Sequence, residues 1–170
     1  MKLFKKLFKR ISRKIDFNRR GITIWPGAYV YPTADIGCGV SVGRNAEIGD
    51  KVYIGCNTRI GHGAFIPAGV TVEAGCFIGP GVIFTNDNFP PSPKDEWRNT
   101  LVRSGAAIGA GCVIKPGIVI GERAMIGCGS VVTKSVPGYE IWAGNPARRI
   151  DENLVMHVAG IFKEPSKASA

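Results

Sequence analysis

IGDKVYIGCNTRIGHGAFI, residues 48–66, carries an isoleucine at every sixth position. Moving outward in steps of six, each position from Ile24 to Phe84 is Ile, Val or Phe, and the same register resumes from Val102 to Val132. Neither the helical period of about 3.6 residues nor the strand period of 2 produces this spacing. The sequence therefore predicts a repeat of six residues, interrupted once.

Two further positions of the repeat are restricted. The residue after the large apolar one is often glycine, where a corner can demand a backbone conformation closed to other residues: Gly37, Gly43, Gly49, Gly55, Gly61, Gly79, Gly109, Gly121 and Gly127. The residue two places before it is small or β-branched, as at Val40, Ala46 and Thr58. This pattern predicts short strands, three to a triangular coil, stacked as an all-β parallel β-helix over residues 21–140. A β-sandwich would instead show alternation with period two and irregular turns.

The composition agrees with one repetitive domain. The 170 residues include 23 glycines and 11 prolines, which favours turns over long helices, and 45% of them are hydrophobic, which is enough for one core.

The net charge of +9 is concentrated at one end. Residues 1–20 hold nine Lys or Arg and one acid, Asp16, giving +8, and the rest of the chain holds 13 basic and 12 acidic groups, giving +1. Apolar residues of the 3–15 segment follow the helical period, so residues 1–20 are predicted to form a basic amphipathic helix. The interpretation favoured is peripheral contact of residues 1–15 with an anionic membrane. A cap on the first coil and a nucleic-acid contact are the alternatives, and nucleic acid is not expected as a partner.

Five cysteines, without a signal-peptide core or a run long enough to span a bilayer, predict free thiols in a reducing cytoplasm. The expected location is therefore cytoplasmic, with peripheral attachment to the inner face of the membrane as the variant. Cys38 and Cys56 are separated by three repeats, which is one full coil, and would stack on neighbouring coils within disulfide range. Packed thiols are the simpler interpretation, and no pair has zinc-ligand spacing.

The repeat is interrupted by TNDNFPPSPKDEWRNTL, residues 85–101. Its three prolines and its charged and amide residues cannot continue a coil, so this segment is predicted to be an extruded loop. A long loop on a rigid scaffold is usually functional or disordered, and Phe89 and Trp97 argue against disorder.

The repeat over residues 22–136 resembles the hexapeptide-repeat acyltransferase family. The resemblance implies left-handed coils and a homotrimer with its sites in the clefts between subunits. Phe84-Thr85-Asn86-Asp87, with Pro90 and Trp97-Arg98, resembles the branch of N-acetyltransferases that act on nucleotide-linked amino sugars for bacterial surface polysaccharides. It implies that Asn86 first and Asp87 second lie beside the sugar amine, with Phe84, Thr85, Trp97 and Arg98 at the substrate. Turn chemistry is the alternative explanation of Asn86 and Asp87.

The acceptor is predicted to be an amine. O-acetyltransferases that resemble this fold place a histidine in the loop as general base, and this loop has none. An amine with a pKa near ~8 is already partly neutral and nucleophilic. His62 is the alternative base, although counting by 18 places it between Arg44 and Pro80, on another face than Asn86. Gly61-His62-Gly63-Ala64 also resembles the γ-class carbonic anhydrases, but two histidines cannot supply their three ligands, so no metal is expected.

The end of the repeat reads VVTKSVPGYEIWAGNPARRI, residues 131–150. It resembles the family's terminal Gly-Asn-Pro-Ala-Arg signature, which borders the coenzyme A cleft. The implied contacts are Lys134, Gly144, Asn145, Pro146, Ala147, Arg148 and Arg149. A cap built around Trp142 is the alternative. Residues 141–170 are expected to form this edge strand, a short helix over 151–162 and a loose tail.

The resemblance, with the loop that lacks a histidine, implies an enzyme that transfers an acetyl group from acetyl-CoA to the amino group of a nucleotide-linked amino sugar. Two alternatives stay open: a sugar O-acetyltransferase with His62 as base, and a noncatalytic β-helix scaffold.

Overall fold

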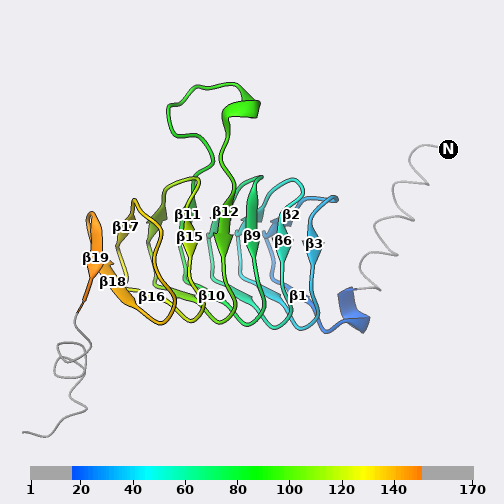
Figure 1. The fold of residues 1–170 in the computed structure, drawn as a ribbon. Helices are drawn as coiled ribbons and strands as arrows, with labels where there is room; N and C mark the ends of the chain where they lie inside the picture. The colour runs from blue at the N-terminus through cyan, green and yellow to red at the C-terminus, as the bar shows by residue number, and fades with distance from the viewer. Residues whose placement is uncertain (1–16, 151–170) are drawn as a thin grey trace, which may run out of the picture.

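The computed structural model describes residues 17–150, and these form a left-handed β-helix of stacked triangular coils (Figure 1). The strands are β1 (Thr23–Ile24), β2 (Tyr29–Val30), β3 (Asp35–Ile36), β4 (Ser41–Val42), β5 (Glu47–Ile48), β6 (Tyr53–Ile54), β7 (Arg59–Ile60), β8 (Phe65–Ile66), β9 (Val70–Val72), β10 (Phe77–Ile78), β11 (Ile83–Phe84), β12 (Thr100–Val102), β13 (Ala107–Ile108), β14 (Val113–Ile114), β15 (Val119–Ile120), β16 (Met125–Ile126), β17 (Val131–Val132), β18 (Ile141–Gly144) and β19 (Ala147–Arg149). The fold class predicted from the repeat is confirmed.

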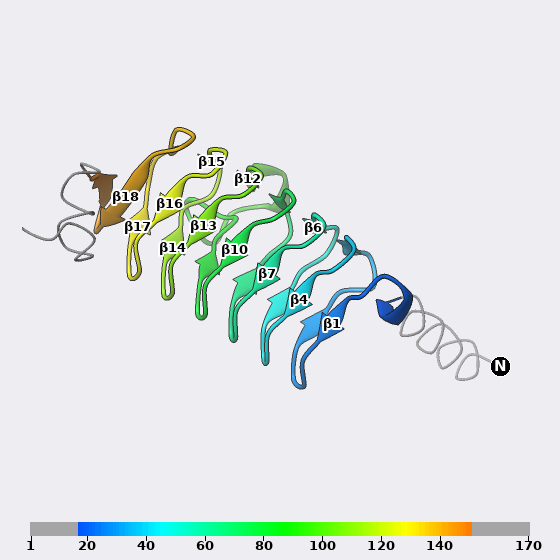
Figure 2. The same cartoon turned by 90° about the horizontal axis from the view of Figure 1, so that it is seen from below.

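The strands line up as three sheets, one for each side of the triangle, and all strand pairs are parallel except that of β18 with β19. Sheet A has the order β1-β4-β7-β10-β13-β16-β18-β19, sheet B the order β17-β14-β11-β8-β5-β2, and sheet C the order β15-β12-β9-β6-β3. Partner residues are three repeats apart along the chain, as in Ile24 with Val42. Across the loop the step is longer, as in Ile78 with Ile108. The loop therefore lengthens one coil without disturbing the stack, and Figure 2 shows sheet A face on, with its strands still in sequence order.

The interior is filled by the residue that recurs every six positions. From Ile36 to Val132 each member of that register is buried, and Phe84 is fully enclosed. The smaller residues two places earlier, such as Val40 and Ala46, are buried beside them. Burying such side chains contributes roughly 1.5–3 kcal/mol each, so the period itself stabilises the stack.

The glycines that follow the buried residue have a different cause from the one predicted. The left-handed backbone conformation occurs at other glycines, such as Gly39 and Gly63. At Gly61 a Cβ atom would lie 2.3 Å from the backbone nitrogen of Pro80, on the next coil. Glycine is therefore required there because consecutive coils approach too closely for a side chain, and the conformational explanation was wrong for this set.

Three corners join the sheets, and we name them by the sheets they connect: corner AB, corner BC and corner CA. The loop leaves from corner BC, after β11 (Figure 1). It is shorter than predicted, because Thr100 and Leu101 belong to β12 and pair with Val70 and Thr71. The extruded segment is residues 85–99.

The predicted terminal helices lie almost entirely outside the described residues. Of the 1–20 segment only residues 17–20 are described, and 17–19 are helical; the 151–162 segment is not among the described residues. Between residues 17 and 150 there is no helix long and apolar enough to cross a bilayer.

Candidate functional site

The loop is anchored where it leaves and rejoins the stack. The backbone N–H of Arg98 donates to the carbonyl of Asn86 at 3.0 Å, so the two arms meet at corner BC. A single 3-10 turn, η1 (Lys94–Glu96), lies in the returning arm. This closure fixes Asn86 at the base of the loop.

The side-chain amide of Asn86 is fixed by a hydrogen bond from its nitrogen. Its Nδ2 donates to the carbonyl of Ala68, one coil earlier, at 3.3 Å. No hydrogen bond to its Oδ1 occurs among residues 17–150, and the side chain is partly exposed. The amide therefore presents an oriented acceptor at the surface of corner BC.

Asp87 is committed to the loop itself. Its carboxylate accepts hydrogen bonds from the Phe89 N–H at 2.9 Å, the Ser92 N–H at 2.9 Å and the Ser92 hydroxyl at 2.5 Å. These bonds, that of the Ser92 hydroxyl first, hold the pKa of the Asp87 carboxyl below its usual value. This geometry supports turn chemistry for Asp87 over a role as a proton acceptor.

A groove of about 800 Å³ begins at Asn86 and runs along corner BC toward the N-terminal coils. Aromatic and charged side chains share its wall. It is lined by Tyr31, Glu47, Gly49, Asp50, Lys51, Phe65, Pro67, Ala68, Gly69, Val70, Thr71, Asn86, Lys94, Trp97 and Asn99. Most of these residues escaped the sequence analysis. Counting back by 18 from Asn86 gives Ala68 and Asp50, so a signal for them existed.

Trp97 lines this groove with an unsatisfied donor. Its Nε1 is buried and has no hydrogen-bond partner among the described residues, and the same holds for the Oδ1 of Asn88. The ammonium of Lys94 lies 5.7 Å from the centre of the Trp97 ring. Phe89, at the other arm, is 83% exposed. Buried polar atoms are seldom left unpaired, so these two atoms are candidates for contact with a bound molecule, a water or a neighbouring chain.

The remaining substrate positions predicted in and beside the loop differ from one another. Phe84 has no exposed surface and belongs to the core, so its assignment as a substrate contact was wrong. Thr85 turns inward, and its hydroxyl donates to the carbonyl of Ile114 at 3.0 Å. Arg98 is exposed and packs its stem close to Gly117 of the next coil. Of these positions, Trp97 and Arg98 remain accessible.

The terminal motif forms a hairpin at corner AB. β18 extends sheet A, and β19 returns antiparallel to it, pairing Gly144 with Ala147. Gly144 has a φ of 100° and donates its N–H to the hydroxyl of Ser130 at 3.1 Å, while Ala147 is buried. Arg148 and Arg149 are exposed, and Arg149 lies 3.6 Å from the carboxylate of Glu140.

Lys134 lies apart from this hairpin. It follows β17 and is therefore at corner BC, while the hairpin turn is at corner AB, beyond the other end of sheet B. In the preceding coil Lys115 occupies the equivalent corner, after β14. The predicted coenzyme A residues thus divide into two groups, and Lys134 and Lys115 share their corner with Asn86.

His62 is at corner AB, between Arg44 and Pro80, as the count by 18 predicted. Its Nδ1 accepts a hydrogen bond from the Arg44 N–H at 2.7 Å. The ring of Trp25 stands edge-on to it at 6.4 Å. With Nδ1 used as an acceptor, the neutral ring carries its proton on Nε2, so its outward nitrogen is a donor rather than a base.

The predicted residues therefore lie along the two edges of sheet B. Corner BC carries Asn86, the loop, the groove and Lys134, and corner AB carries His62 and the terminal hairpin. Within one chain these two sets are separated by a sheet.

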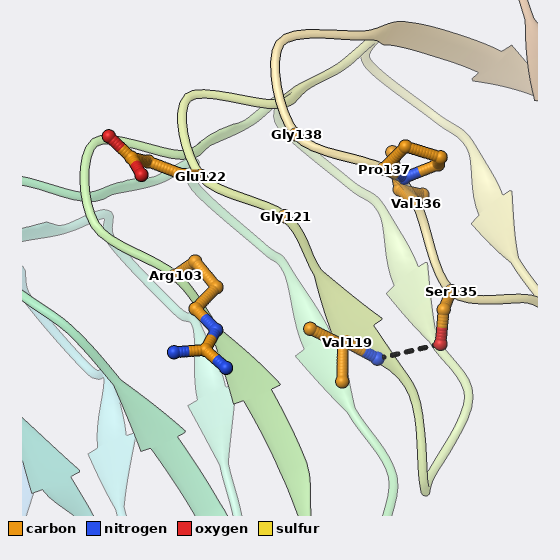
Figure 3. Close-up of a pocket in the computed structure, with 8 residues that line it drawn as sticks. All are labelled: Arg103, Val119, Gly121, Glu122, Ser135, Val136, Pro137 and Gly138. Carbon is orange, nitrogen blue, oxygen red and sulfur yellow. Dashed lines mark hydrogen bonds between the residues drawn. The ribbon is translucent and has the colours of Figure 1, made fainter.

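A second hollow, of about 530 Å³, lies on sheet C and corner CA (Figure 3). Arg103, Glu122 and Ser135 are among its lining residues, and the Ser135 hydroxyl accepts from the Val119 N–H at 3.0 Å. It includes none of the predicted site residues. Across residues 17–150 no three His, Cys, Asp or Glu side chains gather as a metal site would require.

Comparison with known proteins identifies the family to which the repeat is similar. Residues 51–86 and 99–134 match the family described as bacterial transferase hexapeptide (six repeats). A stretch of 30 residues is 60% identical to dTDP-3-amino-3,6-dideoxy-alpha-D-galactopyranose 3-N-acetyltransferase of Aneurinibacillus thermoaerophilus. That stretch is 18% of this chain and 16% of the relative.

Solved structures resemble the whole coil stack. A histidine-to-alanine variant of GDP-perosamine N-acetyl transferase from Caulobacter crescentus, in complex with CoA and GDP-perosamine, is 26% identical, with a TM-score of 0.68 over 85% of this chain. The chain spans 66% of that protein's length. The acetyltransferase domain of PglB from Neisseria gonorrhoeae, in complex with acetyl coenzyme A, shares the fold at 24% identity, with a TM-score of 0.68 over 84% of this chain and 66% of that one.

Proposed function

We propose that this hexapeptide-repeat protein is an acyltransferase that carries an acetyl group from acetyl-CoA to the amino group of a nucleotide-linked amino sugar. The observation that carries the proposal is Asn86, an oriented amide with a free Oδ1 at the head of a groove. The similarity of the chain to two N-acetyltransferases of nucleotide-linked sugars supports the same chemistry.

The groove suits an acceptor that combines a nucleotide with a sugar. Its volume of about 800 Å³ is within the range of small-molecule sites. The aromatic side chains of Tyr31 and Phe65 offer surface to a base, and the ammonium groups of Lys51 and Lys94 offer charge to phosphates. The sugar then lies at the Asn86 end.

The acyl donor is assigned to the other side of Asn86. Lys115 and Lys134 follow it along corner BC toward the C-terminal end of the stack. Arg148 and Arg149 of the hairpin add exposed cationic groups. Phosphates of coenzyme A are the natural ligands for these side chains.

The reaction requires orientation more than proton abstraction. The Oδ1 of Asn86 accepts a hydrogen bond from the neutral amine and aims its lone pair at the thioester carbonyl. The nitrogen–carbon bond forms, the carbon–sulfur bond breaks, and the departing thiolate takes the proton that the nitrogen loses. No covalent intermediate on the enzyme is needed.

The site is proposed to be shared between copies of the chain in a homotrimer. The loop residues and the terminal hairpin lie at opposite edges of sheet B and cannot meet within one chain. Exposed apolar side chains on sheets A and B, among them Phe65, Phe77, Ile83 and Met125, offer surface for a neighbour. The exposed Phe89 and the unpaired Trp97 Nε1 are further groups that such a neighbour can cover.

The test is turnover on a panel of acceptors. The protein is incubated with acetyl-CoA and nucleotide-linked 3-amino and 4-amino sugars, and release of the free thiol is followed. Thiol release with at least one amine supports the proposal. Release only with hydroxyl sugars would overturn the amine assignment, and release with neither would favour the scaffold alternative.

The variant His62→Ala distinguishes the proposed N-acetyltransferase from the alternative, an O-acetyltransferase that uses His62 as base. The amine reaction predicts little loss, because the outward nitrogen of His62 is a donor. Loss of most of the activity in His62→Ala, with activity on hydroxyl sugars, would favour O-acetylation.

A further inference from the structure

Corner CA carries a cysteine pair that the proposed transfer reaction does not use. Cys38 and Cys56 are the central residues of this corner in the first and second coils. The backbone N–H of Cys38 donates to the Sγ of Cys56 at 3.1 Å, and the N–H of Asn57 donates to the carbonyl of Cys38 at 2.7 Å. The two residues are stacked directly, one on each coil.

The spacing of the coils suits a disulfide. A Cβ at Gly37 would lie 2.5 Å from the backbone nitrogen of Cys56, so the backbones are packed as closely as they can be here. Parallel strands lie about 4.8 Å apart, and disulfides join Cα atoms separated by about 4.4–6.8 Å. Cys38 is exposed and Cys56 is partly exposed, so small reagents reach both.

The two thiols also differ in reactivity. Hydrogen bonds from the Cys38 thiol and then from the Cys38 N–H lower the pKa of Cys56, and Arg20 adds a smaller favourable charge. The same bond between the thiols raises the pKa of Cys38. Cys56 is therefore the more acidic thiol of the pair, and Cys38 is a less acidic thiol held beside it.

The other cysteines provide an internal contrast. Cys76 and Cys112 are buried, burial raises the pKa of each, and each thiol donates to a backbone carbonyl at 3.1 Å. Cys128 is exposed and stacks on Ala110 of the preceding coil, and the other cysteine of its corner, Cys112, is buried. Among the described residues, the Cys38 and Cys56 pair alone combines access with a stacked partner.

We propose that Cys38 and Cys56 form a thiol-modification site that reacts with low-molecular-weight disulfides and closes into a disulfide between the first two coils. The Cys56 thiolate attacks one sulfur of glutathione disulfide, which breaks its S–S bond and releases one glutathione thiolate. Cys38 then loses its proton to solvent and attacks the Cys56 sulfur, which releases the second glutathione. Two protein thiols are oxidised, and one glutathione disulfide is reduced to two thiols.

The Cys38–Cys56 disulfide would link the first two coils covalently at the N-terminal end of the stack. The strands of the first coil pair with other strands on one side only among the described residues, and on the other side the Gly39 N–H donates to the carbonyl of Arg20 at 2.9 Å. Terminal repeats are held by fewer contacts than internal ones. A bond across coils one and two restricts the ways in which this end can open. It lies at corner CA, away from the loop, so the acyl-transfer site is not blocked.

The test uses the full chain in buffers of stepped glutathione disulfide, followed by peptide mass spectrometry without reduction. We expect a Cys38–Cys56 disulfide within single chains, a glutathione adduct on Cys128, and unmodified Cys76 and Cys112. Cys56 should react at least several-fold faster than Cys128. Equal rates, or an adduct on Cys56 that never closes, would overturn the proposal.

Two variants assign the order of events. Cys38→Ser should trap glutathione on Cys56, and Cys56→Ser should slow modification of Cys38 to the rate of Cys128 or below. Oxidation should raise the melting temperature of the unaltered protein and leave that of Cys38→Ser unchanged. A faster Cys38 than Cys56 in these variants would contradict the assigned roles.

Discussion

Corners AB and BC border the same sheet, and they use the same repeat in different ways. Corner AB is continuous, with glycines at which successive backbones come within contact distance, as Gly61 does with Pro80. Corner BC is interrupted by the loop, is hollowed by a groove and presents Asn86. Corner BC also stacks closely in its N-terminal coils, where a Cβ at Gly49 would lie 2.8 Å from the Ala68 nitrogen. The comparison shows that an edge of the repeat can stack tightly over some coils and still carry a loop and a groove.

The same comparison places two halves of one proposed site on opposite edges of sheet B. Asn86 and Lys134 are at corner BC, and the hairpin with Arg148 is at corner AB. Four experiments test the difference between the two corners and the division of the proposed site between them, beginning with the largest expected effect.

The largest effect is expected where corner AB stacks. Gly61→Ala places a Cβ 2.3 Å from the Pro80 nitrogen, so the coils must separate, and we expect a loss of stability of about 3 kcal/mol or more. Gly63→Ala is the matched control. Its φ is 65° with no atom within 4 Å of an added Cβ, so only the conformational cost of about 1–2 kcal/mol applies. Urea unfolding compares them, and equal losses would contradict the close-approach explanation.

The next effect concerns the chemistry of corner BC. Asn86→Ala removes the oriented acceptor, and we expect kcat/KM to fall by about 10²–10³-fold while the fold is retained. Asn57→Gly removes an amide from corner CA, at a residue with φ of 59° that glycine tolerates, and should leave the rate unchanged. Steady-state rates of both variants and of the unaltered protein, measured at saturating acetyl-CoA, test this prediction. An Asn86 variant as active as Asn57→Gly would remove Asn86 from the mechanism.

Mixing variants tests whether the corners cooperate between chains. Asn86→Ala and Arg148→Glu are each expected to be nearly inactive. In mixed trimers of a 1:1 pool, a site needs an intact corner BC from one chain and an intact corner AB from the next, so ~25% of the sites should recover. The pool is made by unfolding and refolding the two proteins together. Activity no higher than that of the separate variants would place the whole site in one chain.

The smallest effect is a titration within the loop. The Ser92 hydroxyl and N–H lower the pKa of Asp87, so this carboxylate stabilises the folded loop above the unfolded pKa of about 3.9, and the contribution is lost as the pH falls through the lower folded value. Ser92→Ala should raise the pKa of Asp87 and move that loss to higher pH. Ser104→Ala removes a hydroxyl that binds Glu73 instead, and should leave Asp87 unchanged. Carboxyl NMR shifts measure both, and an unaltered Asp87 in Ser92→Ala would contradict the assigned hydrogen bond.

Much of the site could be predicted because it is local in the chain. The loop is visible as the one break in the register, and Asn86 closely follows the last strand before it. Phe84 was misassigned because the residues that follow it in its motif are partly exposed while Phe84 itself holds a core position in the register, which a strict count of six would have flagged. The role of Asp87 could not be predicted from the sequence, because its hydrogen bond with Ser92 exists only once the turn between the two residues has folded.

The sequence by itself determined the period, and with it the buried residues, because each coil repeats the same steric requirement along the chain. It also determined where the stack must open, because prolines and charges cannot occupy an interior of isoleucines. Only the tertiary structure decided which glycines are required by contact, which corner carries each residue, and that Cys56 accepts a hydrogen bond from Cys38. These depend on how closely one coil approaches the next, a distance set by the closed triangle and not by any single repeat within it.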